Sequence, residues 1–254
     1  MSSVLWTPAP TVFDLRSVLA EVYGDTDTGR TRWSLTAPDP IALIHFGEKV
    51  RGIVEQFSIL GKRIMMTDCG GVYRGSRDDI KSVARAAEAK MFDHIYDSFG
   101  WAKTVILDTH NDAWSLSRFA EFGGSKPTGG RVDRNYEDIN NRWRQMLVAA
   151  RQSGKNVILI GMTADEWIAS QSGGQDKKSG RTVRATHYSP LPIKVDVTVR
   201  TYSQLKQGGG KSFLSVIEKP WMNAAAGGMI LTDDMSNFPT TMSLITGTSA
   251  EEWK

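Results

Sequence analysis

Short apolar runs recur along the first two thirds of the chain and predict a buried sheet. Residues 41–46 are almost continuously apolar, and residues 17–23, 104–109 and 156–162 each contain a short apolar run. Such runs are typical of strands that are buried on both faces of a parallel sheet. Residues 63–67 form a weaker strand candidate.

Two amphipathic segments between these runs predict helices. In residues 76–99, apolar side chains recur at three- and four-residue steps, and Ser76 and Asp79 form a capping-box pattern at the start. Residues 136–153 carry a similar stripe and end before Gly154. The alternation of strands and helices indicates an α/β fold, with a mostly parallel sheet between two layers of helices.

The last third of the chain has a different pattern. Residues 194–202 alternate apolar and polar side chains, and residues 211–218, 227–232 and 241–246 are shorter strand candidates. Closely spaced short strands predict that antiparallel strands extend the sheet. The expected division of the chain is an N-terminal lead-in, one domain and a C-terminal tail, at residues 1–16, 17–232 and 233–254.

Composition places the chain among ordinary globular proteins. Hydrophobic residues make up 40% and charged residues 23%, and 31 basic against 28 acidic side chains give a net charge of +3. This charge is too small to indicate nucleic-acid binding by itself, so any such function depends on local clusters. No run of about 18 apolar residues occurs, so we expect a cytoplasmic protein without a membrane segment.

Cysteine and histidine offer no metal site in the sequence. Cys69 is the only cysteine, which excludes an internal disulfide and a cysteine-based zinc site and agrees with a reducing compartment. The histidines lack the spacing of metal ligands, so packing or surface roles are expected for all four. They are His45, His94, His110 and His187.

The segment YGDTDTGRTRWSL, residues 23–35, is the strongest candidate for chemistry. Gly24, Gly29, Arg30 and Thr31 fit the phosphate-loop pattern G-x-x-x-x-G-K-[ST], except that arginine replaces the lysine. Glycines in such a loop let backbone N–H groups converge on phosphate oxygens. The alternative is an ordinary turn. The predicted nucleotide-binding residues are Gly24, Asp25, Thr26, Asp27, Thr28, Gly29, Arg30, Thr31 and Arg32.

Two acids that follow apolar strands are candidates for the same site. Asp108 ends the run 104–109, where a P-loop ATPase places the carboxylate of its magnesium shell; the alternative role is to cap the next turn. Glu48 follows the run 41–46 and is suited to orient a water molecule for attack on a γ-phosphate; the alternative is a solvated side chain beside Lys49.

Two glycine-rich loops carry basic side chains that suit the phosphates of single-stranded DNA. Residues 123–131 and 170–184 each follow a predicted strand, so both are expected at the same edge of the sheet as the phosphate loop. The second loop is polar and is expected to be mobile. Plain solvated charge is the alternative, because no aromatic residue is interleaved for base stacking. The basic residues are Lys126, Arg131, Lys177, Lys178, Arg181 and Arg184.

Taken in order, these segments resemble a known family. The stretches YGDTDTGRTRWSLTAPDP, TVILDT, NVILIGM, LPIKVDVTV and VIEKP cover about residues 17–220 and resemble the RecA-like P-loop ATPases of bacteriophages, which are linked to single-strand annealing and recombination. The resemblance implies a RecA-like fold, ATP and Mg²⁺ as cofactors, and a ring or filament that engages single-stranded DNA in the host cytoplasm. RNA or a protein such as a single-strand-binding protein stays open as the partner.

The resemblance also implies roles for individual residues. These are Thr31 and Asp108 for magnesium, Glu48 for the attacking water, Thr163 for sensing the γ-phosphate, and Lys219 for action in trans. From the residues alone, Lys219 is equally an ordinary charge at a strand edge. Two departures concern turnover: Arg30 is a planar fork where the family has a compact lysine, and Thr163 lacks the usual amide or imidazole.

The function predicted from these features is ATP binding with DNA-dependent hydrolysis, in recombination or replication. Arg30 puts hydrolysis in question more than binding, because it replaces the side chain that reaches the β- and γ-phosphates. One alternative is a degenerate P-loop protein with a structural or partner-binding role. Another is a kinase for a small molecule, with the basic segment around Arg181 as its lid.

Overall fold

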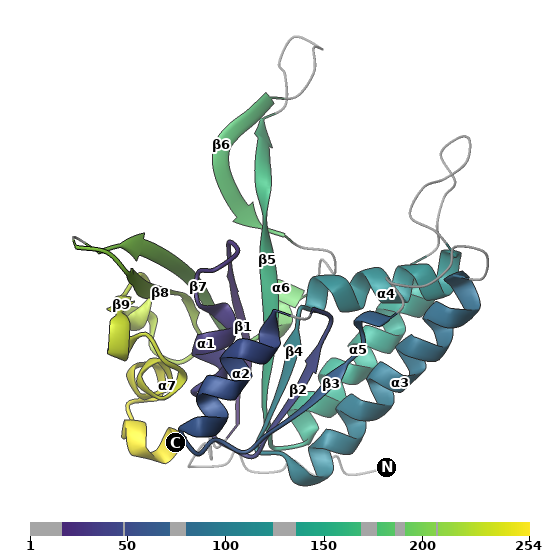
Figure 1. Ribbon diagram of the computed structural model, residues 1–254, viewed down its shortest axis with the longest axis horizontal. Helices are drawn as coiled ribbons and strands as arrows, with labels where there is room; N and C mark the ends of the chain where they lie inside the picture. Colours follow the sequence, from purple (N-terminus) through teal and green to yellow (C-terminus); the bar gives the residue numbers. More distant parts are fainter. Residues whose placement is uncertain are drawn as a thin grey trace, which may run out of the picture.

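A nine-stranded mixed sheet runs through the part of the chain that the structure describes (Figure 1). This computed structural model describes residues 17–47, 49–71, 80–123, 136–168, 177–185, 191–206 and 208–254, without the side chains of residues 167, 168, 177, 192 and 193. The strand order is β3-β2-β4-β5-β1-β7-β8-β9, and β6 pairs with β5. The strands are β1 (Leu19–Gly24), β2 (Ile41–His45), β3 (Ile64–Asp68), β4 (Thr104–Asp108), β5 (Asn156–Ile168), β6 (Lys177–Arg184), β7 (Val197–Leu205), β8 (Lys211–Pro220) and β9 (Ile230–Thr232).

Helices cover both faces of this sheet (Figure 1). One face carries α3 (Ile80–Trp101), α4 (His110–Phe122) and α5 (Glu137–Gln152). The opposite face carries α1 (Arg30–Leu35), α2 (Val50–Ile59) and α7 (Phe238–Thr246). The short helix α6 (Leu191–Lys194) leads into β7.

The buried strands supply side chains to both layers in turn. On β1, Leu19 packs beneath α3, α4 and α5, whereas Ala20 and Val22 pack beneath α1 and α2. This alternation follows from the period of two in a strand, and it explains why strands buried on both faces are apolar at nearly every position. The predicted α/β class is therefore confirmed: β1 to β5 and β7 pair in parallel, and β8 and β9 extend the sheet antiparallel.

The basic segment expected to be a mobile loop is in part a strand. β5 continues to Ile168, well past the predicted end at residue 162, and β6 returns along it from Lys177 to Arg184. The expectation was therefore wrong for residues 177–184, because the backbone pairing of β5 and β6 does not depend on apolar periodicity. Figure 1 shows this hairpin rising out of the sheet.

The C-terminal residues fold against the domain. Residues 233–254, expected as a tail, form η4 (Asp233–Met235), α7 and η5 (Ala250–Trp253). The run 241–246, predicted as a strand, lies in α7, because Asn237 caps the helix by accepting from Thr240 N. Phe238 then packs edge-on between the aromatic rings of Trp33 and Trp253.

Two further expectations concern the cap before α3 and the absence of a membrane-spanning helix. The predicted capping box of Ser76 and Asp79 lies outside the described residues, while the helix it precedes is present as α3. None of the described helices is both long enough and apolar enough to cross a membrane.

Candidate functional site

The predicted phosphate loop forms a tight turn between β1 and α1. Gly29 takes φ of 90° and Asp27 takes φ of 61°, which is left-handed backbone that glycine and aspartate tolerate. A Cβ on Gly24 would lie 2.5 Å from the carbonyl oxygen of Thr201, so no side chain fits there. Thr28 Oγ1 donates to Asp25 O at 2.7 Å and closes the loop.

The loop meets the acid that ends β4. Thr31 Oγ1 donates to Asp108 Oδ2 at 2.8 Å, although 77 residues separate them in sequence. Burial raises the pKa of Asp108 above its ordinary value, while the Thr31 hydrogen bond and the nearby charge of Arg30 act in the opposite direction. A hydroxyl and a carboxylate are thus held side by side in a desolvated place.

Arg30 extends from the loop to the neighbouring strand. Its Nη1 donates to Gly161 O on β5 at 2.6 Å. Burial lowers the pKa of Arg30, and the charges of Asp108 and Asp25 oppose this shift. The guanidinium therefore stays within the site, but in the described conformation one of its donors is engaged by the sheet.

An open cavity of about 620 Å³ lies over the loop. It is lined by the loop residues, Asp108 and Asp112, and by residues of α2 and β8. Its cations are Arg30, Arg32, Lys49 and Lys211, and its apolar wall residues include Val50, Ile53 and Phe213. The volume suits a ligand as large as a nucleotide, and the mixture of cations and apolar surface suits a phosphate chain joined to a base.

Phe213 and His45 line the cavity but were not predicted as site residues from the sequence, whereas Arg32 was. The Arg32 guanidinium lies 5.6 Å from the ring centroid of Phe213, although the two residues are on α1 and β8. His45, expected in a packing or surface role, is buried on the cavity wall, and its Nδ1 lies 2.9 Å from Gly47 O. Strand pairing places His45 beside Asp108. The only sign of this position in the sequence is that His45 lies at the carboxyl end of its predicted strand, because the carboxyl ends of parallel strands meet at one edge of the sheet.

The residues present fit magnesium bound together with a nucleotide. Among the described residues, no group of three or more His, Cys, Asp or Glu side chains is arranged to hold a metal ion. Mg²⁺ needs no such group, because it binds one or two protein oxygens and completes its shell with phosphates and water. Thr31 Oγ1 and the Asp108 carboxylate are oxygen donors of this kind.

Other predicted residues have different surroundings. Thr163 was expected at a strand end but lies in the middle of β5, where its Oγ1 donates to Asp25 Oδ1 of the phosphate loop. Lys219 Nζ donates to Val195 O at 2.5 Å, near the start of β7 and away from the loop. Glu48, Lys126 and Arg131 lie outside the described residues.

The four basic residues of the hairpin also differ from one another. Lys178 Nζ pairs with Asp165 Oδ2 at 2.5 Å, and Arg181 is exposed. Arg184 is instead turned inward and pairs with the fully buried Glu21 of β1. The side chain of Lys177 is not described. The expected run of four surface cations is therefore not continuous, because Arg184 neutralises a buried carboxylate.

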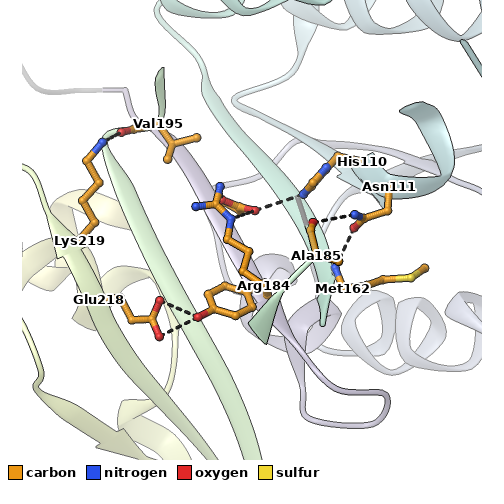
Figure 2. A network of polar contacts seen from close by, with 10 residues as sticks. His110, Asn111, Met162, Arg184, Ala185, Val195, Glu218 and Lys219 are labelled. Atoms are coloured by element: carbon orange, nitrogen blue, oxygen red, sulfur yellow. Dashed lines mark hydrogen bonds and ion pairs between the residues drawn. The ribbon is translucent and has the colours of Figure 1, made fainter. Parts of the chain in front are cut away.

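A polar network joins the base of the hairpin to the start of α4 (Figure 2). Asn111 Oδ1 accepts from Met162 N at 2.8 Å, and its Nδ2 donates to Ala185 O at 3.0 Å. His110 Nε2 lies 3.2 Å from Glu21 Oε1, and as the carboxylate only accepts, the ring donates. The hairpin is thereby fixed to the segment that directly follows Asp108.

Burial shifts the pKa values of two groups in this network. It lowers the pKa of His110 to about 4, with the charge of Asp112 acting against the shift, and it lowers the pKa of Arg184 to about 10. At neutral pH the His110 ring is therefore uncharged, and Arg184 is the cation that balances Glu21.

No curated protein matches the chain, but solved structures that resemble it over most of its length are known. The crystal structure of the RadB recombinase is 14% identical over 85% of this chain and 86% of that chain, with a TM-score of 0.47. A KaiC-like protein from the hyperthermophilic archaeon Pyrococcus horikoshii OT3 is 12% identical over 80% of this chain and 79% of that chain, with a TM-score of 0.39.

A family profile gives the decisive match. The profile described as an AAA domain matches residues 19–225, from the first residue of β1 to beyond β8. The matched segment contains the phosphate loop, Asp108 and the β5–β6 hairpin. The chain, with its phosphate loop on a mixed α/β sheet, therefore belongs to the AAA domain family.

Proposed function

We propose that the protein binds ATP with Mg²⁺ on the loop Gly24–Thr31 and hydrolyses it to ADP and phosphate. The observation that carries this proposal is the 2.8 Å hydrogen bond between Thr31 Oγ1 and Asp108 Oδ2 under an open cavity. Magnesium, when bound, supplies positive charge to the phosphate oxygens. Thr31 and Asp108 would hold the ion, and Arg30 and Arg32 line the cavity as cations for the phosphates.

Arg30 decides between an active ATPase and a degenerate one. Its guanidinium donates to Gly161 O on the sheet and has to turn away from this contact to reach a phosphate. An arginine fork carries its charge on a wider group than lysine does, so it is less suited to a narrow loop. The second candidate function, a nucleotide-binding subunit without turnover, is supported by this one contact.

Hydrolysis assays separate these two functions. We expect slow release of phosphate by the wild type, faster release by Arg30→Lys, and at least a hundredfold loss in Asp108→Asn. Single-stranded DNA is expected to raise the wild-type rate. Negligible phosphate release by wild type and Arg30→Lys alike, with and without DNA, would exclude the ATPase and leave the degenerate P-loop protein.

Single-stranded DNA is the proposed partner. Lys178 and Arg181 lie on a hairpin that projects from the sheet (Figure 1), and Arg181 is exposed. Cations on a projecting element suit a phosphate backbone, whose binding is strengthened by counterion release. Lys126, Arg131 and Lys177 are proposed to add to the same surface, and the expected signature is an affinity that falls steeply with salt.

Self-association is part of the proposal. Lys219 lies away from the phosphate loop of its own chain, so a role at a nucleotide requires a second copy in a ring or filament. Glu48 is proposed to orient the attacking water and Thr163 to sense the γ-phosphate. A phage origin, recombination or replication as the process, and the host cytoplasm as the location complete the proposal.

A further inference from the structure

One face of the C-terminal strands has no helix packed on it among the described residues. The buried cluster beneath α3, α4 and α5 contains no side chain of β7, β8 or β9. The cluster beneath α1 and α7 takes Val197 and Val199 from β7 and Ile217 from β8. Because side chains alternate along a strand, Arg200 and Tyr202 lie on the face opposite to α1.

Strand pairing gives the composition of that face. Arg200 lies opposite Val216, and Tyr202 lies opposite Leu214. Val216 in turn lies opposite Ile230, whose side chain is 63% exposed at the edge of the sheet. We call these five residues the β7–β9 face. It combines one aromatic ring, one guanidinium and three aliphatic side chains.

Arg200 organises this face and connects it to the hairpin. Its Cζ lies 4.8 Å from the ring centroid of Tyr202 and 5.7 Å from that of Tyr23, so the guanidinium lies between two aromatic rings. Its Nη2 also donates to Thr182 O at 3.1 Å and lies 3.2 Å from Thr182 Oγ1 on β6. The β7–β9 face thus adjoins the basic hairpin directly.

The charges around the face favour a polyanion. Arg181 is exposed on β6, one residue from the Thr182 contact. Of the nearby carboxylates, Asp165 is paired with Lys178, whereas Glu218 accepts from Tyr23 Oη at 2.7 Å and keeps its negative charge. A partner with a row of phosphates and flat rings therefore matches cations on the hairpin and an aromatic, aliphatic surface beside them.

We propose that the β7–β9 face is a stacking platform for the bases of single-stranded nucleic acid, whose phosphates follow β6. Tyr202 takes a base on its ring, and Arg200 holds that ring in place. Lys178 and Arg181 contact the backbone. This inference rests on the nucleic-acid binding proposed above. It adds a surface that contacts the bases to the hairpin that contacts the phosphates.

The test separates bases from phosphates. Fluorescence anisotropy is measured with a labelled thymidine oligonucleotide and with an abasic oligonucleotide of equal length, each over a range of salt. Wild type is expected to bind the thymidine strand more tightly. Tyr202→Ala is expected to lose roughly tenfold in affinity for thymidine, with unchanged affinity for the abasic strand and an unchanged salt slope.

Three variants serve as controls. Tyr202→Phe keeps the ring and is expected to bind like wild type, which shows that the ring and not the hydroxyl is needed. The unchanged affinity of Tyr202→Ala for the abasic strand excludes a loss caused by misfolding. Tyr96→Ala removes an exposed tyrosine from α3 and is expected to have no effect. Arg181→Gln is expected to weaken binding of both strands alike and to flatten the salt dependence, because it removes a phosphate contact.

The possible failures are distinguishable. Absence of wild-type binding to either strand at low salt overturns the platform together with DNA binding. Wild-type binding that is unaffected by Tyr202→Ala overturns the platform alone. A change in the molar mass of Tyr202→Ala by light scattering, without a change in thymidine affinity, also overturns it and makes the face a contact between copies of the chain.

Discussion

The phosphate-loop edge and the β7–β9 face are assembled in opposite ways. At the phosphate loop, eight consecutive residues from Gly24 to Thr31 form the turn under the cavity, and a distant acid, Asp108, meets it at Thr31. The β7–β9 face instead takes its five side chains from three strands and adjoins the cations of a fourth, β6. A site of the first kind leaves a compact pattern in the sequence, whereas one of the second kind leaves almost none.

Two arginines on β6 offer the sharpest way to break this comparison. Arg184 is buried against Glu21, and Arg181 is exposed, although only two residues lie between them. We expect Arg184→Met to lower the free energy of unfolding by about 3–5 kcal/mol, because it leaves a buried carboxylate without its cation. Arg181→Met is expected to change it by less than about 0.5 kcal/mol. Urea unfolding of the two variants measures both values.

A second substitution checks the cause of that loss. Adding Glu21→Gln to Arg184→Met removes the uncompensated charge and is expected to restore much of the lost stability. Equal losses in Arg181→Met and Arg184→Met, or no recovery in the double variant, would contradict the assignment of Arg184 to the core.

The pH dependence of stability tests the polar network that includes His110. The pKa of His110 is about 4 in the folded protein and near its ordinary value of 6.5 in the unfolded chain. The unfolded chain therefore binds more protons between these values, so stability is complete above pH 6.5 and falls as pH drops toward 4. His110→Gln is expected to reduce this loss, as measured by thermal unfolding over the same range.

His94 provides the matched histidine for this experiment. It lies on α3 and is not part of the network, so His94→Gln is the comparison for His110→Gln. A profile that responds to both substitutions equally would show that His110 has no special share in the acid sensitivity.

The smallest expected effect concerns Asp108 in the absence of nucleotide. Because burial raises its pKa above the ordinary 3.8, the folded protein holds this proton more tightly than the unfolded chain does. The ionisation of Asp108 therefore lowers the free energy of unfolding as pH rises above that value. Asp108→Asn is expected to be more stable than wild type by about 1 kcal/mol at neutral pH, with the difference shrinking toward pH 4.

Calorimetric melting of both proteins at neutral and acidic pH measures this difference. A variant that is less stable than wild type at neutral pH would show that the Thr31 hydrogen bond outweighs the cost of burying the carboxylate. A more stable variant with lost activity would identify Asp108 as a residue whose burial serves the site at the expense of the fold.

The sequence was most informative where structure is local. Apolar runs predicted β1, β2, β4 and β5, and an amphipathic stripe predicted α5, because burial on one or both faces dictates these periods. The turn at Gly24 and Gly29 was also readable, since the left-handed backbone at Gly29 and the space beside Gly24 both demand glycine.

The sequence was least informative where tertiary contacts decide. The threonine-rich run 241–246 has strand propensity, but packing of Phe238 and Met242 against the core favours α7. Arg184 looked like its neighbours on β6, and only the position of Glu21 shows that it is buried. The contact between Arg32 and Phe213 joins α1 to β8, so no local pattern announces it.

Calorimetric titration of ATP into wild type and Thr31→Val, with and without Mg²⁺, tests the central claim most directly. Valine keeps the shape of the side chain and removes the hydroxyl that bonds to Asp108. We predict that Mg²⁺ strengthens ATP binding by wild type at least tenfold and has little effect on Thr31→Val, while the two proteins bind ATP similarly without the ion. An equal gain from Mg²⁺ in both proteins, or no ATP binding by wild type, would contradict a magnesium nucleotide site at Thr31 and Asp108.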